Sequence, residues 1–369
     1  PGVLGHDLAE PVPGGTPIRR MIQFVVGVGL ALGLLGWALP HFAKTSWGDV
    51  GRVLIAVPRP TAIGLLLLML GGLWLYTFTF TGSLPGLSHG KAMIVNICGS
   101  SVGNLLPGGG AAGVAVTYSQ LRSWGFSRRD ISTSIIVTGV WNVLARLALP
   151  LLGTIFMIFG AGQLNPAVLR AALAGAVGGL GLLALFIAVL ASDRAANVVG
   201  RVMERMVRPL RTWRARRWAK REGMALDTTH PTAGLDGLIT DLRARTIVVV
   251  RHGWVSMTCG MVGFFGMFYM LFWFCLNSTG VQLPFAYMFF AYTLSRLLTA
   301  VGVTPGGLGV TETATAALLV GWGADPAQAT AGVLIFTLFT HILEVPLGAI
   351  GWVFWSASRK TPADGSAEG

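Results

Sequence analysis

Charged residues are scarce in this chain. Asp, Glu, Lys and Arg make up 11% of its 369 residues, whereas apolar residues make up 53%. Because soluble domains carry about 25% charged residues, this composition argues against one. The three cysteines, Cys98, Cys259 and Cys275, lie in apolar surroundings without the spacing of a metal site. We interpret them as packing residues and expect neither a metal nor a cofactor.

Sequence motifs of several enzyme classes are also missing. We find no Walker motif, zincin motif or nucleophile elbow. The pattern Gly108-x-Gly110-x-x-Gly113 matches a dinucleotide fingerprint, but no strand precedes it, so we interpret the match as accidental. An ATP-driven reaction is therefore not expected.

Long apolar runs are abundant, and they predict an all-α, polytopic membrane bundle. Each run meets or approaches the ~20 apolar residues that span a bilayer. No alternating strand pattern competes with this prediction. The runs are Met21–Leu39, Thr61–Phe80, Ile131–Phe159, Pro166–Leu190, Trp254–Leu276, Pro284–Val303 and Ala329–Trp352.

Positive charge is concentrated in one segment of the chain. The formal net charge is +12, and ten Lys and Arg residues between Arg194 and Arg221 accompany one acid, Glu204. Apolar residues recur among them at helical spacing, which predicts an amphipathic helix at the membrane surface rather than a nucleic-acid site. The segment either marks the cytoplasmic side or binds anionic headgroups.

The order of spans and basic loops predicts five regions in a multi-pass protein of a bacterial-type inner (plasma) membrane. Because the strongly basic loops fall on one side, both termini are expected in the cytoplasm. The regions are a disordered tail (1–18), a first membrane repeat (19–190) with a broken helix at 106–113, a basic amphipathic cytoplasmic segment (191–247), a second membrane repeat (248–354) with a broken helix at 304–312, and a cytoplasmic tail (355–369).

Two Pro-Gly-Gly turns interrupt apolar stretches. A shift of 198 residues superposes Pro107-Gly108-Gly109 on Pro305-Gly306-Gly307, and Trp124-Gly125 on Trp322-Gly323. Five crossings separate the turns on the predicted path, so the repeats have inverted topology. In transporters, broken or re-entrant helices of this kind line a substrate site near the midplane. Whether the helices at 110–121 and 308–320 cross fully or re-enter stays open.

Few ionisable side chains lie inside the apolar runs: Arg146, Arg296, Glu312, His341 and Glu344. Since a charge at mid-bilayer costs at least ~2.5–3.5 kcal/mol, they should face the protein interior. We expect Arg296–Glu312 and Arg146–Glu344 to form ion pairs or to enter a polar cavity; static structural bridges are the alternative. The spacing of His341 and Glu344 suits a proton relay or a pair of metal ligands, although no third ligand is apparent in the sequence; the alternative is a satisfied core histidine.

The glycines of both turns suggest a site for an anion. A helix that begins after each turn offers free backbone N–H groups and a positive dipole end, where a phosphate can bind. Simple helix breaking without a ligand is the alternative.

The segment Gly103-Asn104-Leu105-Leu106-Pro107-Gly108-Gly109 and the segment from Arg296 to Glu312 resemble the lysylphosphatidylglycerol synthase transmembrane-region family. The resemblance extends from about Met21 to Trp352. It implies a flippase-type domain that moves phospholipids or other polar lipids between leaflets, with Arg296 and Glu312 in the site. Many members carry an acidic residue after the first turn, where this chain has alanines. The soluble aminoacyltransferase domain is absent, so we expect no lysyl-lipid synthesis.

We therefore predict a lipid translocase rather than an enzyme, passive or ion-coupled, for an anionic phospholipid or a lipid-linked glycan. One alternative is an integral-membrane enzyme that uses Glu312 or Glu344 on a lipid-linked substrate; another is a non-transporting partner of a lipid synthase or glycosyltransferase. The candidate substrate-binding residues are Arg146, Arg296, Glu312, Glu344, His341, Asn104, Pro107, Gly108, Gly109, Pro305, Gly306 and Gly307.

Overall fold

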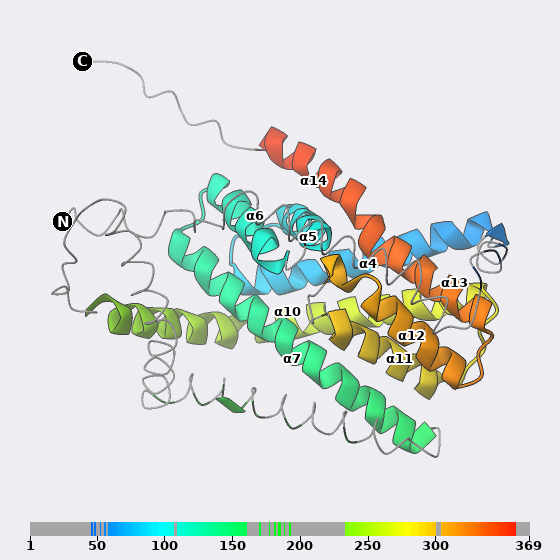
Figure 1. Ribbon diagram of the computed structural model, residues 1–369. Coiled ribbons are helices and arrows are strands. Elements are labelled where there is room, and N and C mark those ends of the chain that lie inside the picture. The colour runs from blue at the N-terminus through cyan, green and yellow to red at the C-terminus, as the bar shows by residue number, and fades with distance from the viewer. Residues whose placement is uncertain are drawn as a thin grey trace, which may run out of the picture.

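The computed structural model describes residues 58–106, 109–160, 233–299 and 304–358, with isolated positions between 46 and 56 and between 170 and 192. The predicted N-terminal tail, the run Met21–Leu39, the basic stretch from Arg194 to Arg221 and residues 359–369 of the predicted C-terminal tail lie outside the described residues. Within them every element is helical, which confirms the all-α fold class (Figure 1).

The helices follow the apolar runs closely. They are α4 (Arg59–Ser83), α5 (His89–Leu105), α6 (Gly110–Ser123), α7 (Arg128–Gly160), α10 (Ala233–Ser278), α11 (Phe285–Leu298), the short η3 (Pro305–Gly307), α12 (Val310–Gly321), α13 (Pro326–Thr337), the π-helical η4 (Leu338–Ile342) and α14 (Glu344–Ser358). Only α10 is much longer than the apolar run that predicted it.

Four helical stretches of the described chain are long and apolar enough to cross a membrane: Arg59–Ser83, Arg128–Phe159, Ala244–Ser278 and Pro326–Ser358. The last joins α13, η4 and α14. These helices are apolar on their outer faces as well as inside: Val262 is 67% exposed and Phe354 63%. A helix that is hydrophobic all round suits a lipid environment, so the prediction of a membrane protein is supported.

Close packing of α4 on α10 forms the centre of the bundle. A Cβ added to Gly253 would overlap the backbone of Gly82, and one added to Gly260 would meet the Thr79 nitrogen at 2.8 Å. Later residues of α10 contact earlier residues of α4, so the two helices are antiparallel. Small residues let membrane helices approach in this way. The buried core beside this pair includes Met69, Phe268, Phe272, Tyr292 and Phe336.

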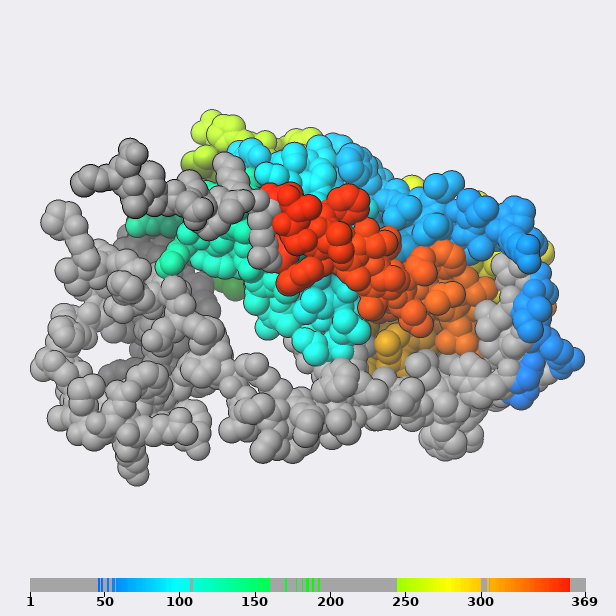
Figure 2. Space-filling model, turned by 90° about the horizontal axis from the view of Figure 1, so that it is seen from above, coloured from blue at the N-terminus to red at the C-terminus, as the bar shows by residue number. Residues whose placement is uncertain are grey.

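The helix α14 lies against α5 and beside α6, as Figure 2 shows. A Cβ on Gly348 would overlap the side chain of Ser101, and one on Gly351 would lie 2.8 Å from Ile97. Farther along, the Trp355 indole donates a hydrogen bond of 2.9 Å to Ser123 Oγ. This packing fixes the start of α14 next to the end of α5.

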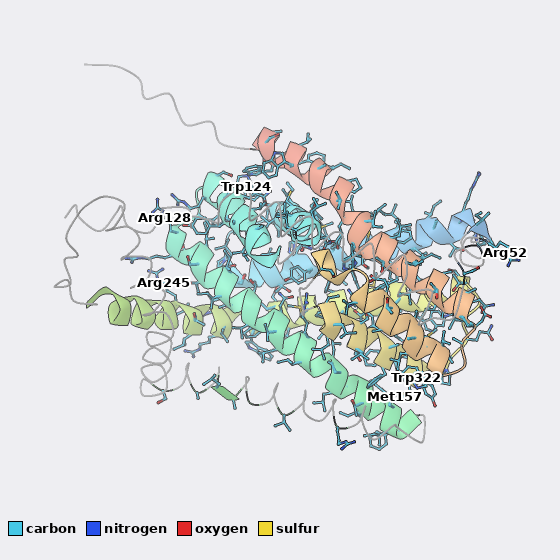
Figure 3. The ribbon with its side chains drawn as sticks, viewed as in Figure 1. Arg52, Trp124, Arg128, Met157, Arg245 and Trp322 are labelled. Carbon is cyan, nitrogen blue, oxygen red and sulfur yellow. The ribbon has the colours of Figure 1, made fainter. Side chains whose placement is uncertain are left out.

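The shift of 198 residues relates local structure after the two turns. Both α6 and α12 end just before a Trp-Gly pair, and Gly125 and Gly323 have φ values of 93° and 97°. The next helices begin at Arg128 and Pro326. Trp124 and Trp322 lie toward opposite ends of the molecule in Figure 3. The inverted repeats and the re-entrant character of the turns stay predictions.

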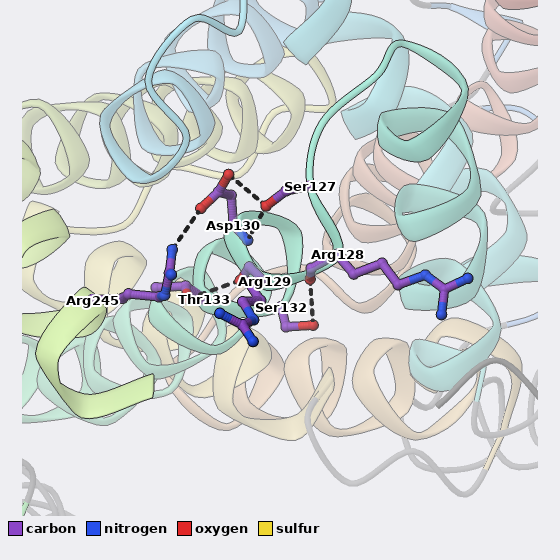
Figure 4. A network of polar contacts seen from close by, with 7 residues as sticks. All are labelled: Ser127, Arg128, Arg129, Asp130, Ser132, Thr133 and Arg245. Carbon is purple, nitrogen blue, oxygen red and sulfur yellow. Dashed lines mark hydrogen bonds and ion pairs between the residues drawn. The ribbon is translucent and has the colours of Figure 1, made fainter. Parts of the chain in front are cut away.

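A polar network caps the start of α7 (Figure 4). Ser127 Oγ accepts from the Asp130 nitrogen at 3.1 Å and donates to its carboxylate at 2.6 Å, which is the pattern of a helix cap. Arg245 of α10 forms an ion pair with Asp130 at 3.3 Å. Both side chains are partly exposed, so this pair contributes little stability. It ties α7 to α10 at the basic end of the bundle.

Candidate functional site

A cavity of about 710 Å³ lies between the helices, and residues from α4, α5, α6, α7, α10, α11, η3, η4 and α14 line it. Four of the predicted ionisable residues, Arg146, Arg296, His341 and Glu344, face it together. Neutral polar side chains also line it: Asn96, Thr138, Asn142, Thr299, Thr304 and Thr340. The structure thus brings residues more than 200 positions apart to one polar cavity inside an apolar bundle.

The two guanidinium groups are positioned by neutral partners. Arg146 donates to Thr299 Oγ1 at 3.2 Å, and Thr299 donates in turn to the Arg296 carbonyl at 2.7 Å. The Arg296 guanidinium lies 4.9 Å from the ring centroid of Phe336, a cation–π contact. Among the described residues, no ion pair involves either arginine. Their charges are therefore available to an anion in the cavity.

The Glu344 carboxylate reaches the cavity from the start of α14. It is 5% exposed, and its Oε2 accepts a hydrogen bond of 2.9 Å from Asn104 Nδ2 at the end of α5. A buried carboxylate needs such a donor, because an unpaired one costs several kcal/mol, on the order of the charged-group desolvation penalty. The contact joins the two halves of the chain.

His341 is held by η4, a π-helical turn between α13 and α14. Thr340 Oγ1 donates to the Phe336 carbonyl at 2.9 Å and lies 2.9 Å from His341 Nδ1. The His341 ring also has a backbone hydrogen-bond partner at Gly306, so both the threonine hydroxyl and the second turn hold the imidazole. Single π-helical turns recur at functional sites. Here the turn directs both Thr340 and His341 to the cavity.

The second turn forms the cavity wall opposite His341. Gly306 and Gly307 adopt φ values of 61° and 78°, which explains why glycine is needed there. A Cβ on Gly306 would lie 2.8 Å from the His341 ring, so the backbone packs directly on the imidazole. The neighbouring Thr304 hydroxyl is buried, lines the cavity and has no hydrogen-bond partner among the described residues.

Glu312 does not line the cavity. Its Oε2 accepts from the Gly309 nitrogen at 2.6 Å, and its Oε1 accepts from Thr337 Oγ1 at 2.7 Å. The carboxylate therefore caps its own helix, α12, in a site that is 1% exposed. At the N-terminus of this helix, the Gly309 N–H is therefore bonded to Glu312 and is not free for an anion.

The remaining predicted residues divide into those that line the cavity and those that lie outside the described residues. Asn104, Gly109, Gly306 and Gly307 line the cavity. Pro107 and Gly108 lie outside the described residues, as does the side chain of Pro305. The expected ion pairs Arg296–Glu312 and Arg146–Glu344 are not present among the described residues.

Apart from Asn104, sequence reasoning missed the neutral polar residues of the cavity. Asn142 on α7 donates to the Tyr76 hydroxyl at 2.5 Å and to the Thr138 carbonyl at 2.9 Å. An asparagine within an apolar run is unusual enough to have been noticed. The threonines are too common in such runs to signal a site.

The fold and this cavity define an integral membrane protein: a helical bundle with a basic, polar site enclosed by apolar spans. The profile of the lysylphosphatidylglycerol synthase transmembrane region matches residues 24–348, and the chain belongs to that family. No curated protein matches the chain.

Proposed function

We propose that this protein is a lipid translocase whose cavity admits an anionic headgroup while the acyl or prenyl chains stay in the bilayer. The observation that carries the proposal is the pair Arg146 and Arg296, which face the cavity without a carboxylate partner among the described residues. Guanidinium groups bind phosphate oxygens through charge-assisted hydrogen bonds. A phosphate of a phospholipid or of a lipid-linked glycan suits them.

Two further features support transport rather than covalent chemistry. The cavity lies between the two sequence repeats, where substrates of transporters with repeated halves bind. Trp124 and Trp322, equivalent in the repeat, lie toward opposite ends, the placement that inverted units would have (Figure 3). With no nucleotide motif in the sequence, movement is passive or ion-coupled.

The orientation in the membrane follows from the arginines at one end of the bundle. Arg122 lies at the end of α6, Arg128 and Arg129 lie at the start of α7, and Arg245 lies at the start of the apolar span of α10. Figure 3 shows Arg128 and Arg245 together near Trp124. Because basic residues favour the cytoplasmic side, we place this end in the cytoplasm of a bacterial-type inner membrane.

The test is leaflet exchange of labelled phospholipid in proteoliposomes. We compare wild type with Arg296→Gln and Arg146→Gln, and with Arg251→Gln, an exposed arginine of α10 outside the cavity, as the control. Loss of a charge-assisted contact should slow exchange by about 10-fold or more in the cavity variants. The control should exchange at the wild-type rate.

Two results would contradict the proposal. Folded wild type that exchanges no anionic phospholipid and no lipid-linked sugar is not a translocase for these lipids. Covalent change of the lipid, detected by mass spectrometry after incubation in detergent, would favour the enzyme alternative.

A further inference from the structure

Among the described residues that line the cavity, one carboxylate is present with two guanidinium groups, and this unequal number of charges suggests how transport is driven. Arg146 and Arg296 face the cavity with Glu344, while Glu312 is sealed at the start of α12. The charges of Arg296 and Glu344 interact electrostatically. In its ionised form, Glu344 balances part of the positive charge of the empty cavity.

A phosphate bound by the two arginines takes over that role. The positive field that favours the ionised carboxylate is then largely cancelled, while the low-dielectric surroundings still oppose a second buried anion. Protonation of Glu344 resolves this conflict. The empty cavity contains the Glu344 carboxylate, and the loaded cavity contains the phosphate and a protonated Glu344. Each state has one negative charge, so the net charge of the cavity is the same in both.

We propose that Glu344 is a proton-binding site, and that one proton enters with each monoanionic lipid and leaves with it on the other side. The inference rests on the proposed function. In chemical terms, the carboxylate takes a proton from water on one side to become a carboxylic acid, and it returns that proton to water on the other side. Lipid and proton together are electroneutral, so the loaded cavity moves no net charge beyond that of the empty one.

Asn104 makes both protonation states of Glu344 acceptable. Its amide donates to the carboxylate at 2.9 Å. An amide also has an acceptor oxygen, so after rotation it can accept from the protonated acid. Neither state leaves a buried polar group unpaired, which would otherwise cost as much as a lost hydrogen bond. Asn104 is thus a positioning residue for the proton site.

The cluster also connects the proton site to several elements of the bundle. Asn104 ends α5, Glu344 begins α14, and His341 occupies the π-helical turn just before it. The backbone of Gly306 packs on the His341 ring, and a Cβ added to Gly306 would lie 3.4 Å from Asn104 Oδ1. Adding a proton to Glu344 changes the hydrogen bond at the point where these four elements meet.

The described titratable and charged groups that line the cavity with Glu344 come from four elements: Tyr76 on α4, Arg146 on α7, Arg296 on α11 and His341 on η4. His341 is itself titratable and lines the same cavity, so it is a second position for a proton. Variants at both residues must therefore be compared.

The first measurement is proton uptake when lipid binds to the purified protein in detergent. Phosphatidylglycerol is titrated at a pH at which Glu344 of the empty protein is ionised, in two buffers of different ionisation enthalpy, and the difference in heat gives the number of protons bound. Wild type should take up about one proton per lipid, because linkage between two ligands is reciprocal. Glu344→Gln should take up none, and His252→Gln, outside the cavity, should match wild type.

Three outcomes of this titration overturn the proposal. The first is wild type that binds lipid without proton uptake, a result that needs no variant to fold. The second is uptake that persists in folded Glu344→Gln. The third is uptake that is lost in His341→Gln and kept in Glu344→Gln, which assigns the proton to the histidine.

The second measurement is leaflet distribution in proteoliposomes of phosphatidylcholine with labelled phosphatidylglycerol. The membrane potential is clamped with potassium and valinomycin, and a pH difference of about one unit is imposed. One-to-one coupling should enrich the label about tenfold in the leaflet that faces the alkaline side. A potential without a pH difference should leave the distribution unchanged.

This design separates failure of the coupling from failure of the proposed function. If labelled lipid equilibrates between leaflets but ignores the pH difference, the translocase stands and the proton site is wrong. If lipid does not exchange under any condition, the proposed function itself fails.

Discussion

The two Pro-Gly-Gly turns have similar sequences and different reasons for their glycines. Gly109 and Gly307 are equivalent under the shift of 198 residues, yet Gly109 has an ordinary helical φ of −62°, whereas Gly307 has a φ of 78°. At Gly109 the space is what matters: a Cβ would overlap the carbonyl oxygen of Gly103. At Gly307 the left-handed backbone matters. A repeat in sequence is therefore not always a repeat in conformation.

The helices that follow the turns differ in the same way. The third residue of α12 is Glu312, which caps that helix, whereas the third residue of α6 is Ala112 and no side chain caps α6. Gly109 and Gly110, at the start of α6, line the cavity. The positive end of α6 is consequently open to an anion, and the positive end of α12 is closed by its own carboxylate.

The substitution with the largest expected effect disrupts the first turn. Gly109→Ala places a Cβ against the carbonyl groups of Gly103 and Leu106, and backbone cannot move aside as a side chain can. We expect a loss of about 3 kcal/mol, the upper part of the usual range for overpacking. The apparent melting temperature in detergent, followed by tryptophan fluorescence, measures it.

Gly110→Ala is the matched control, since a Cβ there meets nothing within 4 Å. Its melting temperature should equal that of wild type or rise slightly, because alanine favours a helix more than glycine does. Equal melting temperatures for Gly109→Ala and wild type would contradict the close approach.

The next largest effect concerns Glu312, whose carboxylate caps α12. Glu312→Gln weakens two hydrogen bonds, to the Gly309 nitrogen and to Thr337, in a site without water access. Hydrogen bonds to charged groups contribute about 1.5–3 kcal/mol, so we expect a loss of about 2 kcal/mol in stability.

The comparison with Glu344→Gln separates structure from transport. Glu344 has one hydrogen-bond donor and faces the cavity, so its variant should lose about 1 kcal/mol of stability, the contribution of a single ordinary hydrogen bond. Binding of anionic lipid, measured by calorimetry, should change instead. The reverse order of melting temperatures would exchange the roles assigned to these two carboxylates.

The third effect tests the left-handed backbone of the second turn. Gly307→Ala should cost about 1–2 kcal/mol, the penalty for an L-residue at positive φ. Gly307→Asn should recover part of this loss, because asparagine tolerates that region. The same pair at residue 109 should show no recovery, since crowding is the cause there. Thermal unfolding of the four variants decides between the two explanations.

Much of the fold could be predicted from the sequence, because apolar length determines which segments span a bilayer. The scarcity of ionisable residues in those segments also identified Arg146, Arg296, His341 and Glu344 before the structure did. The function of Glu312 could not be predicted in this way. It depends on the start of α12 at Val310. Because the helix begins there, Glu312 is its third residue and its carboxylate reaches back to the Gly309 nitrogen.

Other parts of the site had no sequence signal. The π-helical turn at Leu338–Ile342 lies inside a uniform apolar run, and its single extra residue per turn leaves no periodic mark. Thr299 and Thr304 are ordinary residues of such runs, yet one supports Arg146 and the other leaves a hydroxyl unpaired in the cavity. Tertiary packing, rather than local pattern, gives these residues their function.

The substitution with the smallest expected effect on stability makes the start of α6 resemble the start of α12. Ala112→Glu puts a carboxylate at the third position of α6, where it can interact with the free N–H groups and the positive end of the helix. We expect a gain in stability of about 0.5 kcal/mol. The same carboxylate competes with a lipid phosphate, so leaflet exchange of anionic phospholipid should fall several-fold while the protein melts no lower. Ala112→Gln, which is equal in size and uncharged, is the control. Exchange that is slowed equally by both variants would show that bulk, not charge, closes this side of the cavity.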